Sequence, residues 1–131
     1  MSLNVLEGHF NSGSNTFAIV AAKFNQAVVD RLVDGALDGL RRHGVADKNI
    51  TLVRVPGSYE IPLVANKLAL SGKFSSIICL GAVIKGETDH YDHVAGASTN
   101  GIAGISLQTG IPVIFGVLTC DTLEQAINRA G

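Results

Sequence analysis

Residues 17–44, FAIVAAKFNQAVVDRLVDGALDGLRRHG, join a short apolar run to an amphipathic segment. The run FAIVAA (17–22) is almost entirely apolar, which is typical of a parallel strand covered on both faces. In the segment after it, apolar residues recur at helical spacing between Asn25, a candidate N-cap, and Gly44, a candidate C-cap. The stretch therefore predicts a strand followed directly by a helix.

Three further units of the same kind follow along the chain. The predicted strands ITLVRV, SSIICLGAVI and PVIFGVLT are each followed by a predicted helix, at residues 50–55 and 59–72, 75–84 and 93–110, and 112–119 and 121–131. Ser58 is the candidate N-cap of the second helix, and Asp121 with Glu124 is similar to a capping box at the start of the fourth. Three glycines interrupt the third helix at a cost of about 1 kcal/mol each against alanine. They predict a close approach of another backbone.

This βαβαβαβα order predicts an α/β fold, a three-layer α/β/α arrangement around a four-stranded parallel sheet. We expect a single domain over residues 1–131, with residues 1–16 as an amino-terminal arm. Ligands of such sheets bind outside the carboxyl ends of the strands, where the chain order reverses. The loops that follow the predicted strands are 23–25, 56–60, 85–93 and 119–122.

The composition excludes several classes of function. Ten basic and eleven acidic residues give a net charge of −1 without a basic run, so the footprint expected for nucleic acid or an anionic membrane is missing. Only 16% of the residues are charged and 47% are hydrophobic, which favours burial of surface between subunits. The start has no signal-peptide pattern and no apolar run is long enough to span a bilayer, so we expect a cytoplasmic protein. Cys79 and Cys120 lie in apolar runs, as buried cysteines do.

The stretch IKGETDHYDHV (84–94), after the third predicted strand, concentrates two histidines and three acidic residues. A metal site would use His90, Asp92 and His93, with Asp89, but their spacing matches neither a helical zinc pair nor an EF-hand. A solvated polar loop is the plain alternative. Proton transfer by His90 is the third hypothesis, because an unperturbed imidazole titrates near neutrality. The residues alone leave all three open.

Other residues at the same edge of the sheet also have two interpretations. Phe24 could stack on a planar heterocycle or cap the core. Glu60, in the first turn of a helix, suits the helix dipole and could equally accept hydrogen bonds from a polyol. The segment Gly86, Glu87 and Thr88 could present N–H groups and a hydroxyl to an anion, or form an ordinary turn.

Together these loops resemble the 6,7-dimethyl-8-ribityllumazine synthase family of riboflavin biosynthesis. The resemblance covers nearly the whole chain and rests on five segments in order, KFN at 23–25, LRRHGV at 40–45, VPGSYEIP at 55–62, LGAVIKGETDHYDHV at 80–94 and PVIFGVLTCDTLEQAINRAG at 112–131. It implies a flavodoxin-like fold and a transferase without metal or organic cofactor. That transferase would condense 5-amino-6-(D-ribitylamino)uracil with 3,4-dihydroxy-2-butanone 4-phosphate to 6,7-dimethyl-8-ribityllumazine, releasing phosphate and water.

The resemblance also implies roles for individual residues. His90 matches the proton-transfer residue. The residues that match the binding site of the ribitylaminouracil are Phe24, Ser58, Tyr59, Glu60, Ala82, Val83, Ile84 and Phe115. Phe24 would stack on the pyrimidine, and Ser58 to Glu60 would hold its ribityl amine. Glu87, Thr88 and Arg129 match the binding site of the butanone phosphate, where a guanidinium suits the phosphate. Phe115 and Arg129 would come from a neighbouring subunit.

Family members form pentamers, some of which assemble into icosahedral capsids of sixty subunits, with sites between adjacent subunits. The resemblance therefore implies a homopentamer or an icosahedral shell, with riboflavin synthase as a candidate partner. In relatives, a lysine-containing phosphate-side segment and a final helix follow NRAG; this carboxyl-terminal tail is absent from the 131 residues. Two alternatives from other classes remain, a non-catalytic shell subunit that binds flavin or lumazine and a metal-dependent hydrolase built on HYDH.

Overall fold

The computed structural model describes residues 2–8, 13–86 and 90–131. Strands and helices alternate along the chain as the hydrophobic pattern predicts. Their bounds are β1 (Phe17–Ala22), α1 (Gln26–Arg42), β2 (Ile50–Val55), α2 (Ile61–Leu70), β3 (Ser76–Ile84), α3 (His90–Thr109), β4 (Val113–Cys120) and α4 (Leu123–Ala130). Two short 3-10 turns, η1 (Asp47–Asn49) and η2 (Ser58–Glu60), precede β2 and α2.

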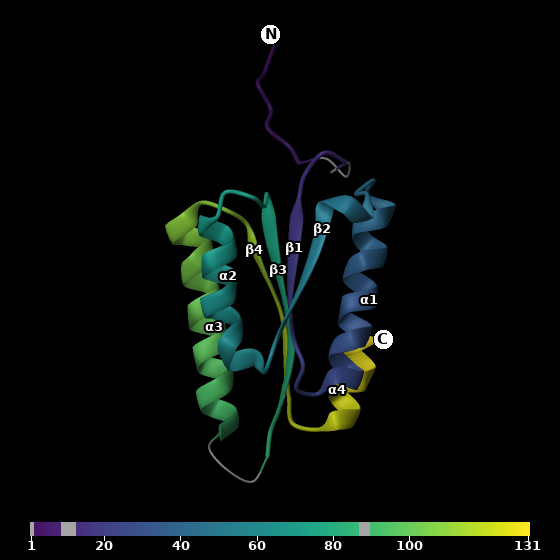
Figure 1. Cartoon of the computed structure of the whole chain (residues 1–131), viewed down its shortest axis with the longest axis vertical. Helices are drawn as coiled ribbons and strands as arrows, with labels where there is room; N and C mark the ends of the chain where they lie inside the picture. The colour runs from purple at the N-terminus through teal and green to yellow at the C-terminus, as the bar shows by residue number, and fades with distance from the viewer. Residues whose placement is uncertain (1, 9–12, 87–89) are drawn as a thin grey trace.

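The four strands form one parallel sheet in the order β2-β1-β3-β4. Helices α1 and α4 cover one face of the sheet, and α2 and α3 cover the other (Figure 1). The predicted three-layer α/β/α arrangement with flavodoxin-like strand order is therefore confirmed. The chain runs outward from β1 to one edge and from β3 to the other, so the order reverses between β1 and β3. A ligand crevice is expected at their carboxyl ends.

The core consists of two clusters, one on each face of the sheet. Residues of β1 alternate between them: Ala18 and Val20 pack with Ile61 of α2 and Ile102 of α3, whereas the next residues along β1 pack against α1 and α4. Residues 18–22 are fully buried, because a central strand with helices on both faces has no exposed side. The continuous apolar run in the sequence follows from this position.

The helix starts differ from the sequence predictions in three places. Ser58 does not cap α2; it begins η2, and α2 starts at Ile61. Helix α3 begins at His90, three residues before the predicted start, and so includes part of the predicted loop. At α4 the cap is Thr122, whose side chain accepts a hydrogen bond from the Gln125 N–H, instead of the predicted pair one residue earlier.

The glycines of α3 have only partly the predicted explanation. A Cβ at Gly101 would lie 2.7 and 2.8 Å from Cβ and Cγ of Pro62, so a neighbouring ring requires glycine there. At Gly96 and Gly104, such a Cβ would have no atom of the described chain within 4 Å, apart from the adjacent residues and the backbone of α3 itself. Among the helices of the described ranges, none combines the length and the apolar character of a membrane span.

Candidate functional site

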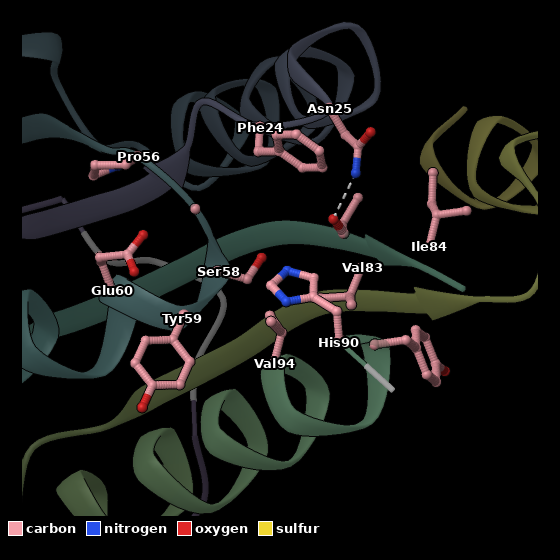
Figure 2. Close-up of a pocket in the computed structure, with 13 residues that line it drawn as sticks. Phe24, Asn25, Pro56, Ser58, Tyr59, Glu60, Val83, Ile84, His90 and Val94 are labelled. Carbon is pink, nitrogen blue, oxygen red and sulfur yellow. Dashed lines mark hydrogen bonds between the residues drawn. The ribbon is translucent and has the colours of Figure 1, made fainter. Parts of the chain in front are cut away.

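A pocket of about 290 Å³ lies at the carboxyl ends of β1, β2 and β3, where the strand order predicts a crevice. Figure 2 shows the side chains around it, which come from four segments of the chain. The lining residues are Phe24, Asn25, Pro56, Gly57, Ser58, Tyr59, Glu60, Ala82, Val83, Ile84, His90, Tyr91 and Val94. Most of this surface is apolar, and a few polar groups converge on it, as in small-molecule sites.

The turn between β1 and α1 presents Phe24 and Asn25. Backbone bonds from the Lys23 N–H to the Val55 carbonyl (2.7 Å) and from the Phe24 N–H to the Pro56 carbonyl (3.0 Å) hold this turn to the neighbouring one. Phe24 is 71% exposed and borders the pocket. It therefore does not cap the core, which was one of the two interpretations of this residue from the sequence. An exposed aromatic face at a pocket can stack on a planar ligand.

Asn25 occupies the N-cap position of α1, but its side chain does not cap the helix. Its φ of 60° lies in the left-handed region, where no other non-glycine residue of the described chain is found. The side-chain Nδ2 donates to the carbonyl of Ala82 at 3.0 Å, the bond drawn dashed in Figure 2. Asn25 therefore ties the turn carrying Phe24 to the end of β3.

The end of β3 extends beyond the strand next to it. Pairing with β1 ends at Ala21 and Leu80, whereas pairing with β4 continues to Ile84 and Cys120. Because backbone groups of successive strand residues point to alternate sides, those of Ala82 and Ile84 face the β1 side, beyond the β1–β3 ladder and next to the pocket, and the Ala82 carbonyl accepts the bond from Asn25. Backbone N–H and C=O groups at such a strand end can recognise the edge of a heterocycle.

The turn η2 brings three predicted residues to the pocket. Ser58 is buried at 6% exposure, whereas Tyr59 is exposed and Glu60 is half-buried at the start of α2. Gly81 of β3 is required beneath this turn, because a Cβ there would overlap Ser58 Oγ. The turn thus presents a hydroxyl, a phenol and a carboxylate beside one another, a set suited to a polyol.

His90 lies in the first turn of α3 and lines the pocket together with Tyr91 and Val94. In Figure 2 the imidazole approaches the pocket from α3, opposite the Phe24 ring on the α1 side. Among residues 2–8, 13–86 and 90–131, no three His, Cys, Asp or Glu side chains are grouped to hold a metal ion. Asp92 and His93 are exposed and do not line the pocket, and Asp89 lies outside the described residues.

Two of the predicted site residues lie outside the described residues, and two others do not line this pocket. Glu87 and Thr88 lie outside the described residues. Phe115, on the edge strand β4, is 44% exposed, and Arg129, near the end of α4, places Nη1 3.8 Å from Cys120 Sγ. Neither Phe115 nor Arg129 lines the pocket of its own chain.

Several residues that line the pocket are not among those predicted from the sequence. Pro56 and Gly57 precede η2, Tyr91 and Val94 follow His90 on α3, and Asn25 follows Phe24. Each lies next to a predicted residue in the loops that the βα order singles out. An asparagine directly after a strand end was a usable signal, because asparagine tolerates the left-handed conformation better than most residues.

Comparison with known proteins identifies the family. The model of the family described as 6,7-dimethyl-8-ribityllumazine synthase matches residues 14–131. The chain is 55% identical over 129 residues to the 6,7-dimethyl-8-ribityllumazine synthase of Lawsonia intracellularis (strain PHE/MN1-00), covering 98% of this chain and 82% of that protein. It is 54% identical over 127 residues to the enzyme of that name from Desulfatibacillum aliphaticivorans, covering 97% and 82% of the two chains.

The corresponding protein of Nitratidesulfovibrio vulgaris (strain DSM 19637 / Miyazaki F) is 53% identical over 131 residues, which are 100% of this chain and 84% of that protein. The family match includes all four strands and all residues that line the pocket. This chain therefore belongs to the 6,7-dimethyl-8-ribityllumazine synthase family.

Proposed function

We propose that this chain is a transferase of riboflavin biosynthesis that condenses 5-amino-6-(D-ribitylamino)uracil with 3,4-dihydroxy-2-butanone 4-phosphate. The products are 6,7-dimethyl-8-ribityllumazine, phosphate and water. The observation that carries this proposal is the pocket of this lumazine synthase family member. An exposed aromatic ring, the end of β3, an imidazole and the turn η2 converge there; we call η2 the polyol-type turn because its hydroxyl, phenol and carboxylate suit a polyol. Each of these groups corresponds to one part of the pyrimidine substrate or to the chemistry.

The pyrimidine would lie between Phe24 and the end of β3. The exposed ring of Phe24 offers a stacking face, and the end of β3 at residues 82–84, where the Ala82 carbonyl already accepts from Asn25, would offer its remaining backbone groups. The ribityl chain would extend along η2 and contact Ser58, Tyr59 and Glu60. This pose uses the planar surface for the planar ring and the polar turn for the hydroxyls.

The chemistry consists of carbonyl condensations and one elimination. The primary amine of the pyrimidine adds to the ketone and loses water to give an imine, and loss of a carbon-bound proton then expels phosphate. After tautomerisation, the remaining carbonyl closes on the ribityl-bearing nitrogen with loss of a second water. Each step moves protons, which we assign to His90, and the pocket holds the two reactants together. Because no step requires a redox or electrophilic group from outside the substrates, we propose a reaction without metal or organic cofactor.

The phosphate side of the site would be completed by Glu87, Thr88 and Arg129, and by assembly. The protein would assemble as a homopentamer or an icosahedral capsid in which Phe115 and Arg129 contribute to the pocket of a neighbouring subunit. Exposed apolar side chains on β4 and α4 support such an assembly, namely Ile114, Phe115, Leu123 and Ile127. A shell of this kind could associate with riboflavin synthase. We also propose that the enzyme works in the cytoplasm, as expected from the sequence pattern.

The deciding experiment mixes the purified protein with both substrates and follows lumazine formation by absorbance. We expect His90→Ala to lower kcat by about tenfold or more, because a positioned acid–base group contributes at least that much. Phe24→Ala should raise KM for the pyrimidine by about three- to tenfold, which corresponds to the loss of one stacking contact. A rate no faster than the spontaneous condensation would refute the proposed function.

Two controls make the result specific. His43→Ala removes an exposed histidine at the far end of α1, bonded to Gly39, and should leave kcat unchanged. Activity after exhaustive chelation should also be unchanged, whereas its loss would favour the metal-dependent alternative. Light scattering on the same sample separates monomer, pentamer and shell.

A further inference from the structure

Ser98 is a polar side chain in the interior of the α2/α3 face that the proposed reaction does not use. It lies in the middle of α3 with 0% exposure, and its Oγ donates to the carbonyl of Ser58 at 2.8 Å. A hydroxyl in such a position costs free energy unless it is hydrogen-bonded. The hydrogen bond from Ser98 to Ser58 satisfies this hydroxyl and connects α3 to η2.

The acceptor occupies a key point of η2. The Ser58 carbonyl also accepts the N–H of Ile61, which closes the 3-10 turn. One carbonyl oxygen thus joins two contacts, the internal bond of the turn and the bond to α3. Tyr59 and Glu60, which lie between Ser58 and Ile61 in the chain, line the pocket together with Ser58.

Close packing on both sides leaves this turn little room. On the β3 side, Ser58 lies against Gly81, where a Cβ would overlap its hydroxyl. On the α3 side, Gly101 lies one turn after Ser98 and admits the ring of Pro62, the second residue of α2. The Ser98 bond is therefore made one turn from the point where the start of α2 packs tightly against α3.

Helix α3 also carries His90 and Val94. Val94 and Ser98 are four residues apart and share a helix face, and His90 lies one turn before Val94. The side chains of His90 and Val94 line the pocket, and Ser98 lies behind them against η2. A bond from Ser98 to Ser58 therefore fixes the polyol-type turn relative to the helix that carries the imidazole.

We propose that Ser98 is a positioning residue that holds Ser58, Tyr59 and Glu60 in the arrangement that recognises the ribityl chain. This inference rests on the proposed function, because it assumes that the turn binds that chain. Without the Ser98 hydroxyl, the Ser58 carbonyl keeps only its bond within η2. The turn then shifts relative to α3, and the hydroxyl, phenol and carboxylate no longer match one polyol.

The test compares two ligands, 6,7-dimethyl-8-ribityllumazine and 6,7-dimethyllumazine, which lacks the ribityl chain. Calorimetric titration gives the Kd of each, and their ratio measures recognition of the ribityl chain alone. For Ser98→Ala we expect this ratio to fall by about threefold or more, as the loss of one hydrogen bond implies. The Kd for 6,7-dimethyllumazine should change by less than about twofold, and Ser98→Cys, a weaker donor of similar size, should lie between wild type and Ser98→Ala.

The matched control is Ser106→Ala on the same helix. Ser106 Oγ donates to the Ile111 carbonyl at 3.0 Å and accepts from the Val113 N–H at 3.3 Å, away from the pocket. This variant loses at least as many hydrogen bonds, yet its ligand ratio should equal that of the wild type. A general loosening of α3 would lower the ratio in both variants.

Several outcomes would overturn the inference. An unchanged ratio in Ser98→Ala, or an equal loss of affinity for both ligands, would show that Ser98 has no positioning role at the ribityl chain. If Ser98→Ala does not fold, Ser98→Cys carries the test on the same criteria. Failure of the wild-type protein to form lumazine from its substrates would instead refute the proposed function, and an active wild type with an unchanged Ser98→Ala ratio refutes only this inference.

Discussion

Replacement of Gly81 by alanine tests how tightly η2 is seated on β3. Gly81 has no left-handed backbone conformation, so alanine fits its dihedral angles and the effect comes from space alone. The new Cβ would overlap Ser58 Oγ and would lie 3.3 Å from Cδ1 of Ile61 and 3.5 Å from Cβ of Ser58. The hydroxyl of Ser58 is thus the main obstacle.

The expected magnitude follows from two opposing effects. Overpacking a tightly packed site costs about 1–3 kcal/mol. Exchange of glycine for alanine within a strand recovers about 0.5–1 kcal/mol, through reduced freedom of the unfolded chain. We expect Gly81→Ala to lower the free energy of unfolding by about 1–2 kcal/mol.

A double-mutant cycle with Ser58→Ala isolates the cause. In the Ser58→Ala background only the flexible end of Ile61, at 3.3 Å, and an ordinary contact with the Cβ of residue 58, at 3.5 Å, remain. Gly81→Ala should then be nearly neutral, and the coupling free energy should be about 1–2 kcal/mol. Urea unfolding measures all four variants, at one protein concentration because self-association would add to the apparent stability.

Gly116→Ala provides the control for this cycle. A Cβ at Gly116 would lie 2.8 Å from the Cys79 carbonyl and 2.7 Å from Cδ2 of Leu80, so a sheet carbonyl obstructs it. Its cost should be the same in both backgrounds. Additive effects of Gly81→Ala and Ser58→Ala would refute the contact between β3 and η2 as the source of the destabilisation.

Three further predictions concern Asn25, Cys79 and Asp47. Asn25→Gly removes the hydrogen bond to Ala82 and should lower the free energy of unfolding, measured in urea, by about 1 kcal/mol. Asn25→Ala should lower it by about 1 kcal/mol more, because alanine also strains the left-handed backbone. Equal losses in the two variants would contradict the strain. Burial raises the pKa of Cys79 to about 12, so its thiol should be unreactive in the folded protein. In a Cys120→Ser variant, a thiol reagent at pH 8 should label Cys79 only as fast as the protein unfolds locally. Rapid labelling of the folded protein would contradict the burial. The hydrogen bond and charge of Arg41 lower the pKa of Asp47 below its ordinary 3.8. This ion pair therefore stabilises the fold above pH 3.8, and its contribution to stability is lost as the pH falls through the lowered pKa. Asp47→Asn should therefore slightly lower the melting temperature near neutral pH and leave it unchanged in strong acid; a difference that persists in acid would point to another cause.

The strands were the most predictable part of the fold. β1 and β2 begin and end at the predicted residues, β3 begins one residue later than predicted, and β4 is shifted by one residue at both ends. The agreement arises because apolar runs bounded by polar or turn residues suit a sheet covered on both faces. The predicted start of α3, at residue 93, was wrong because His90, Tyr91 and Asp92 show no apolar periodicity. Tyr91 nevertheless packs against the core cluster of the α2/α3 face, and this tertiary contact extends the helix toward the pocket.

The candidate site was predictable in location and only partly in its supports. The βα order places the ligand edge, and Phe24 and His90 can be found there from their residue types. The bonds that hold the site, from Asn25 to Ala82 and from Ser98 to Ser58, span 57 and 40 residues of sequence. A local pattern carries no signal of such partners, so an asparagine was predicted as a helix cap and a serine inside a helix was not considered.

The unequal lengths of β1 and β3 have a consequence for how this site could be altered in evolution. Because β3 continues to Ile84 beyond the β1–β3 ladder, the groups next to the proposed pyrimidine position belong to the main chain. Substitutions at residues 82–84 change side chains but leave these N–H and C=O groups in place. Divergence in ligand preference would thus appear first at Phe24 and in η2, whereas a longer β1, which would pair with the end of β3, would remove the main-chain contacts altogether.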